Sequence, residues 1–421
     1  SLSVFYPAEL QPLGPGWSNS YNGCIQNYGD EWYVFWPDGS FHIYDSNSKC
    51  KIDGVYDEFN VISSTLIEIK KKNQVIYSFE QLNDNYPFML TSIRDRNNNT
   101  ISCSYESGYL HRLTSVTGPA GRILDINYNT NDYLLIDSVS DPINRSIHFV
   151  YDDNDNLKEF SDCEGNKTEY IYNDEFSHFH QLIEIQLPKD NTISNVYDLD
   201  KKLQTQNWSG SSGGMNLIIN ENMTTVDYVN SPKTYDINYR ATDEDFQPRI
   251  PGSVGNSSDG FTEFVYNDNN NPTLPTAIQD RNSNYTYYSY NDNGNVEEII
   301  QPLGINHTYE YDDMNNITSY TDPNSNITTY GYDSNGNLTS RTEPEGHTVT
   351  ISRFSNGLIQ SITDIGTVNY GYDDDGNVTS ISDPLNNTTN MAYDGVSRMT
   401  SITNPENQET EYAYNDNDQV T

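Results

Sequence analysis

Short apolar stretches alternate with turn-forming residues along almost the whole chain, at a spacing too short for helices. Asn, Asp, Gly or Pro interrupts the sequence about every ten residues, whereas a helix needs roughly 8–20 uninterrupted residues. The segments between the turns are rich in Tyr, Thr, Ile and Val, which favour strands. The pattern therefore predicts an all-β chain of many short strands joined by tight turns.

One unit of this pattern runs from Tyr332 to Phe354. Its first turn, over 333–337, begins with an Asp that can cap it and places Gly336 where a bulged hairpin requires a left-handed residue. A second turn, over 343–346, has Pro at the position that favours a fixed φ. Each repeat is therefore predicted to contain two strands and two turns, with roughly six residues in each strand.

The unit recurs at a nearly fixed spacing. Tyr290, Tyr311 and Tyr332 are 21 residues apart, a degenerate unit follows with Phe354 in the tyrosine place, and a shorter unit ends at Tyr372. Self-similarity at such a period indicates stacked supersecondary units that share one core. The residues expected to build the repeat are Tyr151, Asp152, Tyr290, Gly294, Tyr311, Asp312, Tyr332, Asp333, Gly336, Asn337, Tyr372, Asp373, Gly376, Asn377, Tyr393, Asp394 and Tyr414.

The alternation within each strand is imperfect. Val378 and Ile381 are three residues apart, so in a regular strand they would face opposite sides of the sheet. Either the strand is buried on both faces or a β-bulge shifts the phase, and the sequence leaves both alternatives open.

The length of the chain sets the size of the array. Dividing 421 residues by the period gives about 17–20 units, or roughly 34–40 strands, in a sheet about 160–190 Å wide. Such a sheet must curl, and curled once it forms a ring about 50–60 Å across that wraps a cavity without closing its ends. We expect opening hairpins over 1–90, repeats over 91–200, degenerate repeats with loops over 201–262, and regular repeats over 263–421.

The charge of the chain excludes several partners. With 22 Lys+Arg against 61 Asp+Glu, the formal net charge is −39, and the longest basic run, 70–72, is interpreted as a solvated strand end or turn. Nucleic acids and anionic membrane surfaces both require clustered basic residues, so neither is an expected partner. No apolar run approaches the roughly 18 residues of a membrane span, so membrane insertion is not expected.

Candidate chemistry is sparse. Four cysteines are too few for a disulfide framework in a chain this long, and a pairing of Cys24 with Cys50 stays open. The histidines of 178–180 are interpreted as a surface pair, and the acidic turns at 152–156 and 373–377 lack EF-hand spacing. The Gly-x-Ser-x-Gly letters at 210–214 lie in a Gly/Ser-rich loop. We therefore predict no metal, no cofactor, no catalytic residue and no enzymatic activity.

Two spaced motifs carry a family resemblance. The segments 332–338 and 372–378, Tyr-Asp-x-x-Gly-Asn-(Leu/Val), resemble the YD repeat of RHS proteins, which include bacterial polymorphic toxins, wall-associated proteins and animal teneurins. The segments 14–21 and 36–41, with Gly-Pro-Gly-Trp and Trp-Pro-Asp-Gly, resemble the opening of an RHS core. The resemblance implies a continuous spiral sheet that forms part of a hollow shell.

The resemblance also implies a function. In RHS toxins the shell encloses a C-terminal toxic polypeptide, so a non-catalytic, encapsulating scaffold of a large secreted or cell-surface protein is expected. Its partners would be the rest of the shell, the cargo domain and the secretion machinery. The Asp-Pro dipeptides at 141, 322 and 383 lack the Gly-Trp of the family's self-cleavage segment and are interpreted as turns.

The alternative function is a surface adhesin or carbohydrate-binding module, in which exposed aromatic rings would hold cell-surface glycans. Because the sequence starts without Met and stops inside a repeat, we also expect it to be a window of a longer protein.

Overall fold

A computed structural model describes residues 12–13, 15, 17–83, 86–107, 111–130, 134–173, 180–189, 191–198, 203–209, 215–219, 223–228, 234–239, 250–256 and 259–421. These residues form 36 strands, within the predicted range, and no α-helix; a short 3-10 helix, η3, spans Pro302–Gly304. All strand pairings are antiparallel and connect the strands into one sheet. The prediction of an all-β array of hairpins is confirmed.

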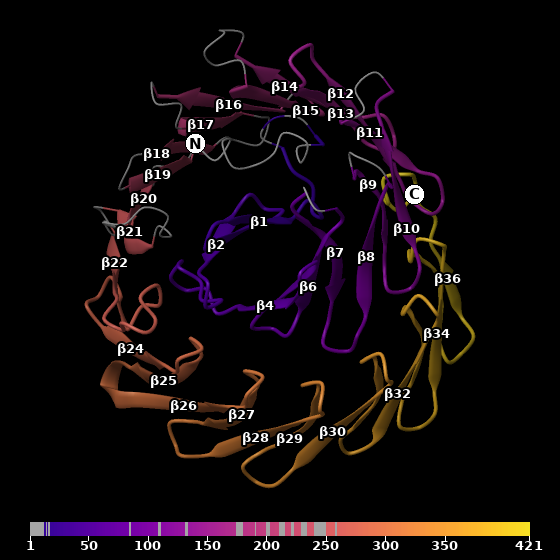
Figure 1. Ribbon diagram of the computed structural model, residues 1–421. Helices are drawn as coiled ribbons and strands as arrows, with labels where there is room; N and C mark the ends of the chain where they lie inside the picture. The colour runs from indigo at the N-terminus through magenta and orange to yellow at the C-terminus, as the bar shows by residue number, and fades with distance from the viewer. Residues whose placement is uncertain are drawn as a thin grey trace.

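Figure 1 shows two concentric rings, which we call the inner ring (β1–β7) and the outer ring (β8–β36). The strands of the inner ring are β1 Cys24–Tyr28, β2 Glu31–Phe35, β3 Phe41–Tyr44, β4 Glu58–Ser63, β5 Leu66–Lys70, β6 Ile76–Gln81 and β7 Phe88–Arg94.

The outer ring begins with β8 Thr100–Tyr105, β9 Leu113–Thr117, β10 Ile123–Tyr128, β11 Ile136–Ser140, β12 Ser146–Tyr151, β13 Leu157–Ser161, β14 Lys167–Tyr172, β15 Leu182–Leu187, β16 Asn191–Tyr197, β17 Leu203–Ser209, β18 Met215–Ile219, β19 Met223–Tyr228, β20 Thr234–Tyr239, β21 Pro251–Asn256 and β22 Gly260–Val265. It continues with β23 Ala277–Gln279, β24 Tyr285–Tyr290, β25 Val296–Gln301, β26 Ile305–Tyr311, β27 Ile317–Thr321, β28 Ile327–Tyr332, β29 Leu338–Thr342, β30 Thr348–Arg353, β31 Ile359–Thr363, β32 Thr367–Tyr372, β33 Val378–Ser382, β34 Thr388–Tyr393, β35 Met399–Thr403 and β36 Glu409–Glu411.

The inner ring holds the densest apolar core of the described chain. Its strands pair in the order β3-β2-β1-β7-β6-β5-β4, and side chains such as Ile25, Ile67, Phe79 and Leu90 are fully buried inside it. Strand β7 joins the two rings, because β6 occupies one edge while β1 and β8 share the other. The outer ring therefore grows from a well-packed nucleus.

A β-bulge in most outer-ring hairpins resolves the phase problem of the sequence. Tyr372 pairs with Val378 while Gly371 pairs with Ser380, so Thr379 is the extra residue. Since Ile381 pairs with Tyr370, both apolar residues of β33 lie on the same face as the repeat tyrosine. The bulge alternative is therefore the right one, and apolar residues three apart are its sequence signature.

The hydroxyl of the repeat tyrosine ties each hairpin to the previous one. It donates to the backbone carbonyl 15 residues earlier, at the bulge of the preceding hairpin, over 2.7 to 3.1 Å. The tyrosines that do so are Tyr105, Tyr128, Tyr151, Tyr197, Tyr266, Tyr290, Tyr311, Tyr332, Tyr393 and Tyr414. The bulge leaves this carbonyl without a partner in the backbone hydrogen bonds between the two strands, and the half-buried tyrosine hydroxyl supplies the missing donor.

The degenerate unit differs from its prediction by one residue. Arg353 pairs with Ile359 as the repeat tyrosines pair in their own hairpins, and its Nε donates to the Leu338 carbonyl at 3.3 Å, again 15 residues back. Phe354 instead occupies the Asp position, with its N–H bonded to the Leu358 carbonyl. The assignment of Phe354 to the tyrosine place is wrong, because an arginine, a poor match by residue type, makes the same hydrogen bond.

The turns of both kinds have the same construction. In the turn that starts at Asp333, Oδ1 accepts the N–H groups of Asn335 and Asn337, and Oδ2 accepts the Asn337 side-chain amide at 3.0 Å. Gly336 has a φ of 81°, a left-handed conformation that favours glycine. The Asp-Pro turn at Asp383 has the same bonds to Leu385 and Asn387, which hold the pKa of Asp383 below its ordinary value.

Three other expectations are corrected. The segment 251–256, expected in a loop, is strand β21, whose pairing with β20 and β22 gives its glycines a place in the sheet. The basic run 70–72 is not simply solvated, because the Lys71 side chain is 25% exposed and bound to Asp57. The sheet also winds around the ring more than once, because hairpins more than 200 residues apart in sequence are hydrogen-bonded to each other. The loop 210–214 lies outside the described residues.

Removing one tyrosine hydroxyl tests the link between hairpins. We expect Tyr332→Phe to destabilise the array by about 1 kcal/mol, because the Ile317 carbonyl loses its donor, and to speed amide exchange across β27–β29. Urea unfolding and hydrogen exchange measure both effects. Tyr330→Phe is the matched control, since the Tyr330 hydroxyl on the same strand makes no hydrogen bond within the described residues; equal effects of the two variants would contradict the assignment.

Candidate functional site

The outer ring has two chemically different faces. The side that carries the repeat tyrosines is the inner one, because Trp17, on the segment that leads into the inner ring, contacts it. The Trp17 Nε1 donates to the Tyr172 hydroxyl at 2.8 Å, and its ring meets Tyr170 edge-on at 4.9 Å between centroids. Burial raises the pKa of Tyr172 to about 12, so its hydroxyl stays protonated.

We call this inner side the lumen face. Directly paired residues along its middle are mostly aromatic or aliphatic, as in Tyr309 with Tyr320, whose rings stack at 5.2 Å. The same row contains the pairs Cys103–Val116, Val139–Ile147, Phe149–Phe160, Tyr170–Ile185, Tyr288–Ile299, Tyr330–Arg341, Ile351–Ile362, Tyr370–Ile381 and Met391–Ile402. In the part of the chain that the structure describes, the row from β24 onward is only half-buried.

The opposite face is mixed, because exposed apolar side chains such as Val150, Ile171 and Tyr287 lie on it beside small polar pairs. The pairs that alternate with the apolar row include Gly331 with Ser340 and Gly371 with Ser380. A Cβ on Gly331 would lie 2.5 Å from the Ser340 hydroxyl oxygen, so a larger residue there would require that hydroxyl to rotate away. The lumen face therefore carries the continuous row of apolar pairs, whereas the outer face combines polar pairs with scattered exposed apolar side chains.

The rims of the sheet carry the turns. One rim has the turns that follow a repeat tyrosine, such as 333–337 and 415–419, and we call it the Tyr-Asp rim. The other has the turns between the two strands of a repeat, such as 95–99 and 141–145, and we call it the Asp-Pro rim. Where the sheet has wound once around the ring, which we call one circuit, it overlaps its own beginning. There the Asp-Pro rim of the first circuit meets the Tyr-Asp rim of the second circuit, and we call this contact the seam.

The first contact of this seam lies at Arg96. Its guanidinium donates to the Asn316 side chain at 3.2 Å and to the Gly336 carbonyl, 240 residues along the chain. Next to it, the Asn97 and Asn337 side chains exchange hydrogen bonds of 3.1 and 2.6 Å. The strands from β8 to β28 therefore complete one circuit, and the sheet winds on past its own beginning.

Two further arginines repeat the arrangement. Arg122 donates to the Ser397 hydroxyl, and Arg145 donates to the Asp416 carbonyl at 3.0 Å and pairs with the Asp418 carboxylate. Arg145 also pairs with Asp141 of its own turn at 2.7 Å, and its side chain is only 14% exposed. Each arginine thus inserts from one rim into a turn of the other.

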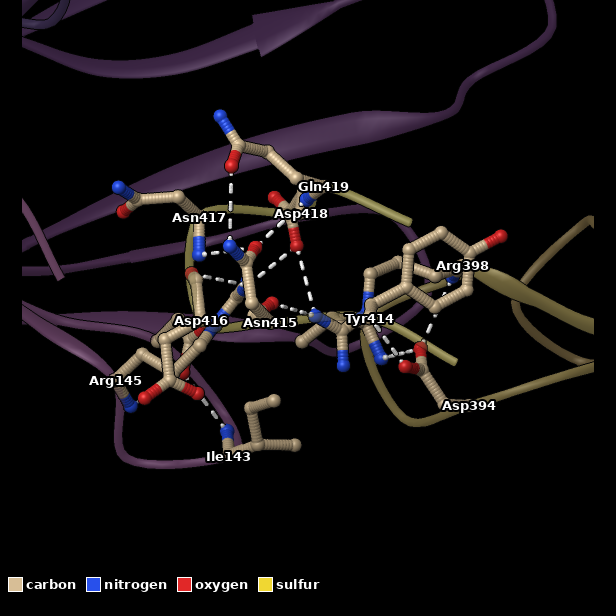
Figure 2. Close-up of polar contacts among 12 residues, drawn as sticks. Ile143, Arg145, Asp394, Arg398, Tyr414, Asn415, Asp416, Asn417, Asp418 and Gln419 are labelled. Carbon is tan, nitrogen blue, oxygen red and sulfur yellow. Dashed lines mark hydrogen bonds and ion pairs between the residues drawn. The ribbon is translucent and has the colours of Figure 1, made fainter. Parts of the chain in front are cut away.

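Figure 2 shows how the seam is closed at Asp418. Arg398 approaches this carboxylate from the neighbouring turn at 3.0 Å, bonds the Asn415 carbonyl, and lies over the Tyr414 ring at 5.0 Å. Asp418 is therefore shared by Arg145 of the first circuit and Arg398 of the second, and both guanidinium groups hold its pKa below the ordinary value.

The expected repeat residues separate into two places. The six tyrosines Tyr151, Tyr290, Tyr311, Tyr332, Tyr393 and Tyr414 bond the preceding hairpin on the lumen face, whereas the Tyr372 hydroxyl makes no such bond among the described residues, because its unit is shorter. The Asp, Gly and Asn members lie in the turns of the Tyr-Asp rim. The sequence reasoning did not identify the three seam arginines, although they recur at turns 23 to 26 residues apart.

The remaining chemical candidates have structural surroundings. All four cysteines are free thiols, so Cys24 and Cys50 are not paired. The Asp152 carboxylate already accepts the backbone N–H groups of Asn154 and Asn156 and the Asn156 side-chain amide. His180 lies 2.7 Å from the Asn156 side-chain oxygen, while His178 lies outside the described residues. No group of three metal-binding side chains occurs within the described ranges.

Comparison with known proteins identifies the repeat. The RHS repeat family model matches residues 290–327, 311–348 and 372–409, which lie among the regular hairpins of the C-terminal part of the chain. No curated protein matches the sequence. Within the described residues, no helix is long and apolar enough to cross a membrane.

Two solved structures share a limited similarity with this chain. The crystal structure of TcdB2-TccC3-Cdc42 shares 10% identity and a TM-score of 0.45 with this chain, over 93% of this chain and 21% of that chain. The Photorhabdus luminescens Tc holotoxin pore, with a TccC3 mutation, shares 11% identity and a TM-score of 0.46, over 95% and 27%. The chain spans about a fifth to a quarter of the length of these structures.

Breaking the seam at its most buried arginine tests its importance. We expect Arg145→Met to cost about 1–2 kcal/mol locally, because Asp141 loses the guanidinium that it pairs with at 2.7 Å, whereas Asp418, which is 56% exposed, keeps its pair with Arg398. Amide exchange should speed up in both 141–145 and 415–419, which are far apart in sequence. Arg341→Met is the control, because its exposed pair with Glu343 contributes little; faster exchange in only one of the two turns would contradict a seam.

Acid should open the same contact. The pKa of Asp418 is lower in the folded protein than in the unfolded chain. Its carboxylate therefore contributes fully to the free energy of unfolding above the ordinary aspartate pKa near 4, and this contribution is lost as the pH falls through the folded pKa. We expect the difference in melting temperature between the wild type and Asp418→Asn to be constant from pH 8 to about 5 and to shrink progressively as the pH falls below the ordinary aspartate pKa near 4. Differential scanning calorimetry across this range measures it, and a difference that persists at low pH would show that charge is not the cause.

Proposed function

We propose that this chain, an RHS-repeat protein, builds part of the wall of a hollow shell that encloses the C-terminal polypeptide of a longer exported protein. The observation that carries the proposal is the lumen face, where the bulges gather aromatic and aliphatic side chains into a continuous row. From β24 onward this row is half-buried, so it offers apolar surface to a polypeptide inside the ring.

The seam supports the same function. A wall that retains a chain must close along its rims, and the arginine contacts join circuits that are 220 to 275 residues apart in sequence. The inner ring fills part of the enclosed space with its own core, and the segment at Trp17 fixes it to the wall.

The structure favours this role over a glycan-binding array built from the repeats. The hydroxyls of the repeat tyrosines are engaged with backbone carbonyls, and their rings pack on the lumen face. They therefore cannot present a row of free rings to the outside.

Site-specific photocrosslinking in the full-length protein tests the enclosure. We expect a benzoylphenylalanine at Tyr330, on the lumen face, to crosslink to sequence C-terminal to the repeats. The same group at Thr329, the next residue on the outer face of β28, should not. Mass spectrometry of the crosslinked peptides identifies the partner; crosslinks from Thr329 alone, or none from Tyr330, would contradict the proposal.

A further inference from the structure

A pocket of about 550 Å³ opens beside the inner ring, away from the repeat tyrosines. Three segments form it: residues 18–20, the hairpin of 36–42, and the strand ends at Lys71 and Tyr77. Its volume is within the range of small-molecule sites, and its mouth carries the exposed side chains of Ser20, Asp38 and Ser40.

The base of the pocket is a fixed ammonium group. The Lys71 Nζ lies 2.7 Å from Asp57 Oδ2 and 3.6 Å from the centroid of the Trp36 ring. Asp57 is 10% exposed, so the charge of Lys71 is balanced by a buried carboxylate. An ammonium has three N–H donors, so Lys71, which lines the pocket, keeps donor capacity beyond its ion pair with Asp57 and its contacts with the rings of Trp36 and, at 5.9 Å, Tyr77.

A second donor comes from His42. Its Nδ1 accepts the Trp36 indole N–H at 3.1 Å, so the neutral ring carries its proton on Nε2. Burial and the neighbouring Lys71 lower the pKa of His42 to about 4, which keeps the ring neutral at pH 7. His42 lines the pocket, and no acceptor for its Nε2–H group occurs among the described residues.

The walls supply acceptors and apolar surface. Asp38 Oδ1 accepts the backbone N–H and hydroxyl of Ser40, which leaves Oδ2 free toward solvent. Asn19 and the serine hydroxyls add groups that both donate and accept, while Tyr77 and Ile93 provide apolar wall. With Lys71 balanced by Asp57 and His42 neutral, Asp38 gives the pocket a negative balance.

We propose that this pocket binds a neutral carbohydrate of one or two sugar rings. Sugar hydroxyls donate and accept at once, which matches the mixture of unpaired donors and carboxylate or hydroxyl acceptors around the pocket. The apolar face of a sugar ring can pack on Tyr77 and Ile93. An anion is disfavoured by Asp38, and a cation by the donors at the base.

The site is independent of the proposed shell. It uses no residue of the outer ring, and its polar mouth opens to solvent. A sugar bound here would be contacted by the part of the chain that precedes the repeats.

Ligand-observed saturation-transfer NMR on the whole chain tests the proposal. The probes are glucose, galactose, mannose, N-acetylglucosamine and lactose, with glucuronate as the anionic comparison. We expect at least one neutral sugar to bind with roughly millimolar Kd, as a small polar ligand should. Ser20→Tyr fills the mouth and should weaken binding at least 10-fold, and Ser64→Tyr, at an exposed hairpin tip, should not change it.

Several results would overturn the proposal. They are no saturation transfer to any neutral probe at 20 mM, binding that survives Ser20→Tyr in a folded protein, and glucuronate binding as tightly as glucose. If Ser20→Tyr fails to fold by circular dichroism, Ser18→Phe fills the same pocket from its other side and decides the question by the same criterion.

Discussion

The β-bulge that recurs in most hairpins of the outer ring is the constraint on which the rest of this structure depends. The bulge adds one residue to the strand opposite the repeat tyrosine. Two apolar residues that are three positions apart, such as Val378 and Ile381, therefore point to the same face of the sheet. A regular strand would direct one of each pair outward, and the wall would be apolar on both sides. The bulge also frees a carbonyl, and the next tyrosine hydroxyl bonds it. The bulge is therefore the common cause of two features: the apolar row on the lumen face and the hydrogen bond that joins one hairpin to the next.

Much of this could be predicted from the sequence because it is local. The turns require Asp at their start and a left-handed residue near their end, and both are visible as letters. The number of strands follows from the period. The unit at 353–354 shows the limit of such reasoning: Arg353 makes the tyrosine's contact with a different side chain, so matching by residue type assigned the position to Phe354.

What could not be predicted depends on distant contacts. A single circuit was expected because strand width fixes the length of the sheet, whereas the number of circuits depends on curvature and on what the rims bind. Arg96, Arg122 and Arg145 are unremarkable as isolated letters, and only the winding brings them to turns more than 200 residues away. The inner-ring pocket has the same origin, since Trp36, Asp57 and Lys71 belong to separate hairpins.

The two rings solve the problem of stability in different ways. The inner ring buries large side chains completely, as a globular domain does, and its core includes Tyr44 and Phe79. The outer ring leaves most of its apolar row half-exposed, so each hairpin gains stability chiefly from its neighbours. Contacts limited to neighbours allow an array to fray from its ends. The seam opposes this, because Arg145 and Asp418 make the last hairpin a neighbour of an early one and add long-range contacts to a one-dimensional array.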